Sequence, residues 1–101
     1  MSEPVMVFAS FRPKKGTEKT VEQILRGMVR PTRDEPGNLV YDLYEQTNVG
    51  HVAFHLFEKY VDGPALEAHR ESDHYKQYRA TILKHLDEPI SVCVLSAVDV
   101  V

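Results

Sequence analysis

The sequence predicts an α+β domain with a ferredoxin-like split βαβ fold. Segments of alternating, β-rich residues and segments with helical spacing follow one another in the order β-α-β-β-α-β. The short stretch "TNVG" between the two central β segments indicates a hairpin. With 101 residues and no repeat, linker or low-complexity segment, we expect one domain over residues 1–101.

The first half of the chain contains a strand, a helix and a hairpin. Residues 5–12 are rich in β-forming side chains and run into the turn "RPKKG". From Thr17 onward, apolar residues at i, i+3, i+4, i+7 and i+8 predict an amphipathic helix, which Pro36 and Gly37 should end. Residues 39–46 and 51–60 are the predicted strands of the hairpin.

The second half contains two helical segments and a last strand. Asp62 can cap the first helix, with Pro64 in its first turn. Ser72 can cap a second helix, whose apolar stripe consists of Tyr75, Tyr78, Ile82, Leu83 and Leu86. Pro89 ends this helix, and residues 90–98 form the last predicted strand.

Composition and charge exclude several classes of function. The net charge of −3 at pH 7 argues against a nucleic-acid surface. The only basic cluster, around residues 12–19, has no aromatic ladder, and we interpret it as a solvated turn. No segment approaches the roughly 20 apolar residues of a membrane span, and the N-terminus does not resemble a signal peptide. We therefore expect a cytoplasmic protein without membrane or nucleic-acid partners.

The predicted strands are apolar on both faces, which indicates a homodimer. A split βαβ sheet carries helices on one face only, so its other face would be polar in a monomer. Instead, both alternating sets are apolar in residues 5–11, 53–57 and 92–95. We expect the uncovered face to meet a second copy. Cys93, the only cysteine, lies in the apolar run "ISVCVLSAV" and should be a buried small hydrophobe without an internal disulfide partner.

The stretch "ALEAHRESDHYKQY", residues 65–78, carries two histidines. His69 shares a helical stripe with Leu66 and should point toward the sheet, either as a core histidine bonded to a backbone carbonyl or as a base in a pocket. His74 lies five positions later, about 140° around a continuous helix, and beyond the break expected at Ser72. Helical zinc sites use histidines four apart, so we expect no metal site and interpret His74 as a surface capping residue.

Other polar residues could reach the same pocket. Glu58 lies on an apolar strand face, where a carboxylate is either paired, for instance with Arg79, or functional. Asn38 begins its strand after "EPG", and a turn role explains it equally well. Tyr41 and Tyr44 point to opposite faces of their strand, so at most one of them can reach a given pocket.

Three segments in order, "EPGNLVYDLYE", "FHLFEKY" and "ALEAHRESDHY", resemble the antibiotic biosynthesis monooxygenase family of small dimeric α+β-barrel proteins. The resemblance covers nearly the whole chain and implies facing sheets in a dimer, with a pocket between sheet and helices in each subunit. Characterised members oxygenate quinols or polyketide-derived phenols with O₂ and without metal or flavin. Others degrade haem, some isomerise a small sugar-like signal, and many have no known activity.

Two departures from the family pattern narrow this expectation. Tyr60 stands where many members carry Trp, which changes the size of an aromatic wall. Haem-degrading relatives use an axial His, a Trp and a strand Asn, and this chain has Arg79, His69 and Ala9 at the corresponding positions. All three haem-related groups are missing, so haem degradation is disfavoured.

The resemblance thus implies a cofactor-independent monooxygenase that oxidises a small phenol, quinol or polyketide-like aromatic with O₂. Such a site needs a base, donors for the substrate anion and an apolar cavity. His69 suits the base. The predicted substrate-binding residues are Asn38, Phe54, Glu58, Tyr60, Tyr75 and Arg79. The alternatives are a non-catalytic dimer that binds a small ligand and an isomerase of a small hydroxycarbonyl compound.

Overall fold

A computed structural model describes residues 3–48 and 50–101 and has the predicted β-α-β-β-α-β order. Its second helical region is divided in two and continues into a 3₁₀ turn. The elements are β1 (Val5–Phe11), α1 (Glu18–Arg33), β2 (Asn38–Asn48), β3 (His51–Tyr60), α2 (Gly63–Glu71), α3 (Asp73–Ile82), η1 (Leu83–His85) and β4 (Ser91–Leu95).

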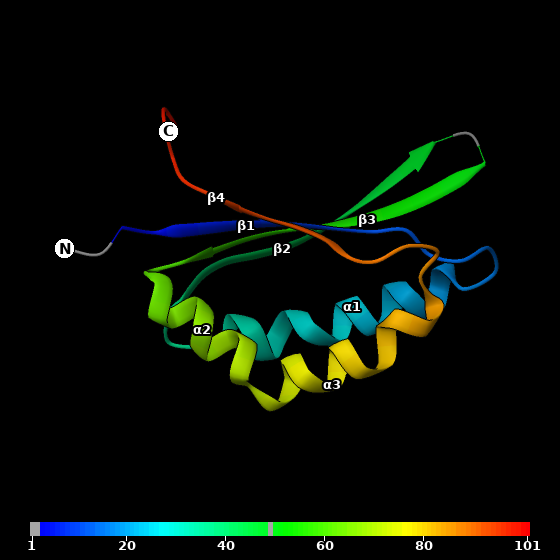
Figure 1. Cartoon of the computed structure of the whole chain (residues 1–101), viewed down its shortest axis with the longest axis horizontal. Helices are drawn as coiled ribbons and strands as arrows, with labels where there is room; N and C mark the ends of the chain where they lie inside the picture. Colours follow the sequence, from blue (N-terminus) through cyan, green and yellow to red (C-terminus); the bar gives the residue numbers. More distant parts are fainter. Residues whose placement is uncertain (1–2, 49) are drawn as a thin grey trace.

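The four strands form one antiparallel sheet in the order β2-β3-β1-β4. All three α-helices lie on one face of this sheet, below it in Figure 1, and the opposite face carries no helix. This arrangement confirms the predicted ferredoxin-like fold. Within the described ranges, no helix is both long and apolar enough to cross a bilayer.

The core lies between the sheet and the helices because both contribute apolar residues at the expected periods. Along β3, alternate residues from Phe54 to Tyr60 are buried and face the helices. The α1 stripe buries Val21, Leu25 and Met28 against them. Each such side chain contributes about 1.5–3 kcal/mol when it leaves water, so this layer holds the domain together.

Both predicted N-caps are present, and the second divides the helical region. The Asp62 side chain accepts a hydrogen bond from Ala65 N at 2.9 Å. The Ser72 side chain accepts one from Tyr75 N at 3.3 Å, while its own backbone is extended with φ −70° and ψ 153°. An extended residue between α2 and α3 redirects the chain, so the helical phase of α2 does not carry over into α3.

The loop between α1 and β2 packs closely on α2 because Gly37 has no side chain. A Cβ at Gly37 would lie only 2.4 Å from the Cβ of Ala65. The Gly37 carbonyl accepts a hydrogen bond from Val61 N at 2.9 Å, which ties the loop to the end of β3. These contacts hold Glu35, two residues earlier, beside the helix that carries His69.

The C-terminal region differs from the prediction in three respects. The last strand covers only Ser91–Leu95 and does not extend to residue 98. Leu83 begins the 3₁₀ turn and is exposed, because the change in helical pitch takes it off the apolar stripe. Cys93 is exposed, contrary to the expectation of a buried hydrophobe, since β4 is an edge strand that pairs only with β1.

Candidate active site

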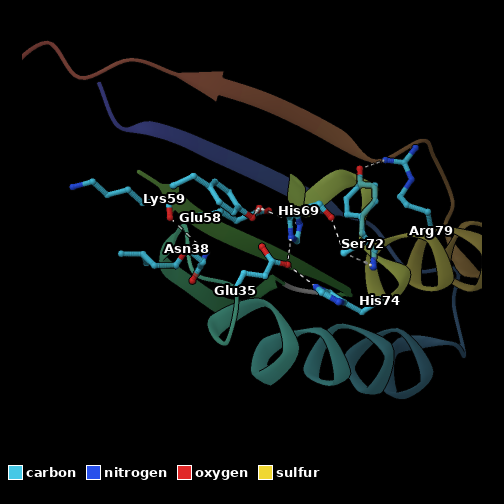
Figure 2. Close-up of polar contacts among 11 residues, drawn as sticks. Glu35, Asn38, Glu58, Lys59, His69, Ser72, His74 and Arg79 are labelled. Atoms are coloured by element: carbon cyan, nitrogen blue, oxygen red, sulfur yellow. Dashed lines mark hydrogen bonds and ion pairs between the residues drawn. The ribbon is translucent and has the colours of Figure 1, made fainter. Parts of the chain in front are cut away.

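A cluster of carboxylates and imidazoles lies under the sheet where α2, α3 and the loop after α1 converge (Figure 2). We refer to Glu35, Glu58, His69 and His74 as the histidine–carboxylate cluster. Glu35 comes from the loop, Glu58 from β3, His69 from α2 and His74 from α3. Four separate elements therefore bring ionisable groups to one place in a mostly apolar interior.

His69 is at the centre of the cluster and points toward the sheet, as its stripe with Leu66 predicts. His69 as a whole is only 2% exposed. Its Nδ1 lies 2.8 Å from Oε2 of Glu35, and its Nε2 lies 3.9 Å from Oε1 of Glu58. The ring packs against aromatic side chains on three sides, with centroids at 5.1 Å for Tyr75, 5.3 Å for Tyr60 and 5.9 Å for Tyr41. The partner of Nδ1 is thus a carboxylate, not the backbone carbonyl of an ordinary core histidine.

Burial and the carboxylate act on the His69 pKa in opposite directions. Burial disfavours the charged imidazolium and lowers the pKa below its ordinary value. The hydrogen bond to Glu35 and its negative charge raise the pKa and offset part of that effect. The result is an imidazole that is neutral at physiological pH but has a counter-charge ready for the protonated form.

Glu58 is a buried acid whose hydrogen-bond partner is Tyr60. The Tyr60 hydroxyl donates to Oε1 of Glu58 at 2.6 Å. Burial raises the pKa of Glu58 to about 7, although the Tyr60 hydrogen bond and the charge of Arg70 act the other way. The suggested ion pair between Glu58 and Arg79 is not formed, because the Arg79 guanidinium donates instead to the Tyr75 hydroxyl at 3.3 Å.

His74 also belongs to this cluster, which corrects the prediction that it is a surface capping residue. Its Nε2 lies 2.5 Å from Oε2 of Glu35, the same oxygen that His69 contacts. The prediction placed His74 on the surface because it lies beyond the break expected at Ser72. The break is present, but the extended backbone of Ser72 turns α3 so that His74 points back toward His69.

A small cavity adjoins His69 and Glu58. Its volume is about 20 Å³, enough for about one water molecule. Tyr75 and Arg79, two predicted binding residues, line it together with His69 and Glu58. Tyr60 is fully buried and contacts the cluster through its hydroxyl and its ring. A phenol is larger than this cavity, so lining side chains such as Tyr75 and Arg79 would have to move for a phenol to bind here.

The other two predicted binding residues lie elsewhere. Phe54 lines a separate, open groove of about 440 Å³ between α1 and β2. The Asn38 side-chain amide donates to the Val40 carbonyl at 3.0 Å, next to a register shift in β2, and this is the turn role that its position after "EPG" allowed. Tyr41 and Tyr44 do face opposite sides, and the buried Tyr41 is the one near His69.

Glu35 is the residue that sequence reasoning missed. It lies in "DEPG", where Pro36 and Gly37 indicate the end of a helix. An acid at such a position is typical of a solvated loop. Its side chain is only 15% exposed because the loop packs on α2 through Gly37. The only signal in the sequence is the Pro-Gly pair directly after the acid, which indicates a tight loop that can pack closely on a neighbouring element.

Comparison with known proteins identifies the family. Residues 4–81 match the family model described as antibiotic biosynthesis monooxygenase. The chain belongs to this family. A Mycobacterium tuberculosis protein named "Putative monooxygenase Rv0793" is 40% identical over 99 residues, which cover 98% of this chain and 96% of the relative. Its solved structure matches with a TM-score of 0.88, covering 96% of this chain and 97% of the other.

Two further proteins are similar to this chain over most of its length. "Putative monooxygenase YcnE" of Bacillus subtilis is 28% identical over 88 residues, which cover 87% of this chain and 90% of the relative. The crystal structure of PA3566 from Pseudomonas aeruginosa is 28% identical with a TM-score of 0.87 and covers 98% of both chains. The family resemblance and the ferredoxin-like fold expected from the sequence are therefore confirmed.

Proposed function

We propose that the protein is a cofactor-independent monooxygenase that oxidises a small phenol, quinol or polyketide-like aromatic with O₂, and that His69 is its base. The observation that carries this proposal is the hydrogen bond between Glu35 and His69, together with the position of the other imidazole nitrogen beside the buried cavity. The membership of the monooxygenase family supports the choice of reaction.

The Glu35 carboxylate selects the tautomer of His69. A carboxylate oxygen accepts hydrogen bonds, so Nδ1 of the neutral ring carries the proton and donates it to Oε2 of Glu35. Nε2 then has the free lone pair and faces Glu58 and the cavity. When Nε2 takes a proton, the nearby carboxylate stabilises the imidazolium, as the acid of a catalytic triad does for its histidine.

The proposed chemistry needs only proton transfer from the protein. His69 removes a proton from an electron-rich substrate, and the resulting anion passes an electron to O₂. Overall, a substrate RH₂ takes one oxygen atom to become RO, and its two hydrogens leave with the second oxygen atom as water. The Arg79 guanidinium and the Tyr75 hydroxyl border the cavity and can donate hydrogen bonds to the substrate oxyanion.

A second candidate function is the isomerisation of a small hydroxycarbonyl compound. It is favoured by one observation: a second proton-carrying group, Glu58, lies 3.9 Å from His69 Nε2. With its pKa raised to about 7, Glu58 can supply a proton at neutral pH while His69 removes one. A third possibility is a dimer that binds a small ligand in the same pocket without turning it over.

Oxygen uptake distinguishes these candidates. Chelator-treated protein, shown to be free of metal and flavin, is mixed with a panel of hydroquinones and naphthols in an oxygen electrode. The monooxygenase should consume O₂, and the product should carry ¹⁸O from labelled gas. Binding without uptake by any member of the panel would favour the ligand-binding protein, and proton exchange at carbon without uptake would favour the isomerase.

We also propose that two copies associate through the helix-free face of the sheet. Phe8 and Leu95 lie on this face and are exposed in the single chain although they are large and apolar. Light scattering at micromolar concentration should give twice the 11.5 kDa chain mass. Phe8→Asp should produce monomers, whereas Leu83→Asp, at an exposed apolar site on the helical side, should not. A monomeric wild type would contradict the proposal.

A further inference from the structure

We propose that Glu35, His69 and His74 bind a divalent transition-metal ion of the Zn²⁺ type, and that this ion inhibits the protein by engaging His69. The metal site itself goes beyond the proposed oxygenase and does not depend on it. Only the inhibition rests on the proposed function, through the role of His69 as base.

The donor atoms already lie around one point. Nδ1 of His69 and Nε2 of His74 lie 2.8 Å and 2.5 Å from the same oxygen, Oε2 of Glu35. All three atoms lie within 4.8 Å of one another. They come from a loop and two different helices, and the dashed lines in Figure 2 show both imidazoles directed at the Glu35 carboxylate.

The donor set and the spacing suit a transition metal. Two imidazoles and a carboxylate form a three-ligand set that Zn²⁺ uses in proteins, with bonds of about 2.0–2.2 Å and a fourth position for water. Donors at a tetrahedral Zn²⁺ lie roughly 3.3 Å apart by that geometry. The two nitrogen–oxygen distances would therefore have to widen by less than about 1 Å, which side-chain rotation can supply.

Glu58 can support the ion from the second coordination sphere. A metal-bound imidazole commonly donates its other N–H to a carboxylate, which fixes the ring. With an ion on Nδ1 of His69, the proton moves to Nε2, which lies 3.9 Å from Oε1 of Glu58. A shift of about 1 Å would make that contact a hydrogen bond.

Surface hollows lead to two of the three ligands. Glu35 lines a depression of about 350 Å³ with Ala65 and Ala68, and His74 lines another of about 240 Å³ beside α1. The side chain of His74 is 26% exposed, while that of His69 is 3% exposed. An ion can thus enter from the His74 side and keep a water ligand without unfolding the core.

Metal binding and base chemistry are mutually exclusive at His69. The proposed base needs a proton on Nδ1 and a lone pair on Nε2. An ion on Nδ1 places the proton on Nε2, so the group facing the cavity becomes a donor and can no longer accept a substrate proton. The metal-bound form should therefore be inactive for as long as the ion stays.

The binding test uses chelator-treated, full-length protein with Zn²⁺ for calorimetry and Co²⁺ for absorption spectroscopy. We expect one ion per chain and a visible Co²⁺ spectrum typical of four ligands that include nitrogen. Zn²⁺ should also raise the melting temperature, because the ion binds only the folded arrangement of these residues.

Matched variants locate the site. His74 is partly exposed, so His74→Gln should fold normally. His74→Gln and Glu35→Gln should each lower the Zn²⁺ affinity at least about 100-fold. Each removes a metal ligand, and the loss of an outer-sphere partner alone costs up to about that factor. His51→Gln, at an exposed position on β3, should keep the wild-type affinity. If either variant does not fold, the Co²⁺ spectrum of the wild type still tests the ligand set.

The outcomes separate the two proposals. Absence of one-to-one binding, or equal affinity in wild type, His74→Gln and Glu35→Gln, would overturn the metal site and leave the oxygenase untouched. Binding followed by faster oxygen uptake would overturn the inhibition. In the expected case Zn²⁺ stops uptake by the wild type, the chelator restores it, and the rate of His74→Gln does not respond to Zn²⁺.

Discussion

Two histidines on opposite faces of the sheet show how partners decide what an imidazole can do. His69, on the helix-covered face, is buried and bonded to the Glu35 carboxylate. His55, on the helix-free face, contacts Ser10 Oγ at 2.9 Å and Gln46 Oε1 at 2.6 Å and stacks on Phe8. Both rings are held in place, but only His69 has a negative charge that stabilises its protonated form.

His69 also has a neighbouring ionisable group with a perturbed pKa. Among the residues that the structure describes, His55 contacts no such group. Glu58 stands beside His69 with its pKa raised by burial, whereas Ser10 and Gln46 remain neutral at all ordinary pH values. Position within a fold is therefore not enough to make a histidine a base. A charged orienting group and removal from water are the features that distinguish the two sites.

Replacement of His69 should have the largest effect on activity. His69→Ala removes the proposed base and should lower the rate of substrate-dependent oxygen uptake roughly 10²- to 10⁴-fold. The dimer mass should not change, since the side chain lies on the helical face. An unchanged rate in a folded dimer would remove His69 from the chemistry.

Glu58 should show its burial in the pH dependence of stability. Its pKa is about 7 in the folded protein and 4.5 ordinarily, so the folded state holds the proton more tightly. This contribution is fully present below about pH 4.5 and is lost as pH rises through about 7. Tyr60 acts on the Glu58 pKa through its hydrogen bond, Arg70 and Glu35 act through their charges, and His69 lies 3.9 Å away.

The measurement is urea unfolding of wild type and Glu58→Gln in chelator-treated buffer at pH 4.5 and pH 7. Between these values the wild type should lose about 3 kcal/mol of unfolding free energy relative to the variant, at 1.36 kcal/mol per pKa unit. Parallel curves for the two proteins would mean that Glu58 is solvated as an ordinary surface acid.

Glu35→Gln tests whether Glu35 positions the imidazole of His69. The amide keeps the size of the side chain but can present its NH₂ to His69 and favour the wrong tautomer. We expect a loss of roughly 10²-fold in kcat, comparable to a misplaced catalytic group, with KM little changed. Glu35→Asp, which keeps the charge, should recover part of the rate, and a purely structural role would not give that recovery.

His55→Ala should have the smallest effect. It removes two hydrogen bonds and a stacking contact on the helix-free face, each worth about 0.5–1.5 kcal/mol. We expect weaker dimerisation in a concentration series and a rate per folded dimer close to that of the wild type. A rate loss as large as that of His69→Ala would show that the active site lies on the helix-free face of the sheet.

Local sequence patterns were sufficient for much of the fold and for half of the cluster. Alternation placed Glu58 on the buried face of β3, the stripe with Leu66 aimed His69 at the sheet, and two side-chain caps set the helix starts. The partner of Glu58 was within reach of the same reasoning, because Tyr60 lies two residues along the same strand face.

The remaining half depends on geometry that no short pattern encodes. His74 joins His69 because the extended Ser72 sets the direction of α3 relative to α2. Glu35 joins both because Gly37 lets its loop approach Ala65. Cys93 and the short β4 were misjudged for a related reason, since an edge position and its exposure depend on the sheet order.

The most direct test of the central claim is the tautomer of His69. Nitrogen-15 NMR of the imidazole in chelator-treated protein near neutral pH reports which nitrogen carries the proton. We expect a protonated Nδ1, hydrogen-bonded to Glu35, and an unprotonated Nε2 facing the cavity, with the preference lost in Glu35→Gln. A ring protonated at Nε2 alone in the wild type would contradict the claim that Glu35 orients His69 as the base.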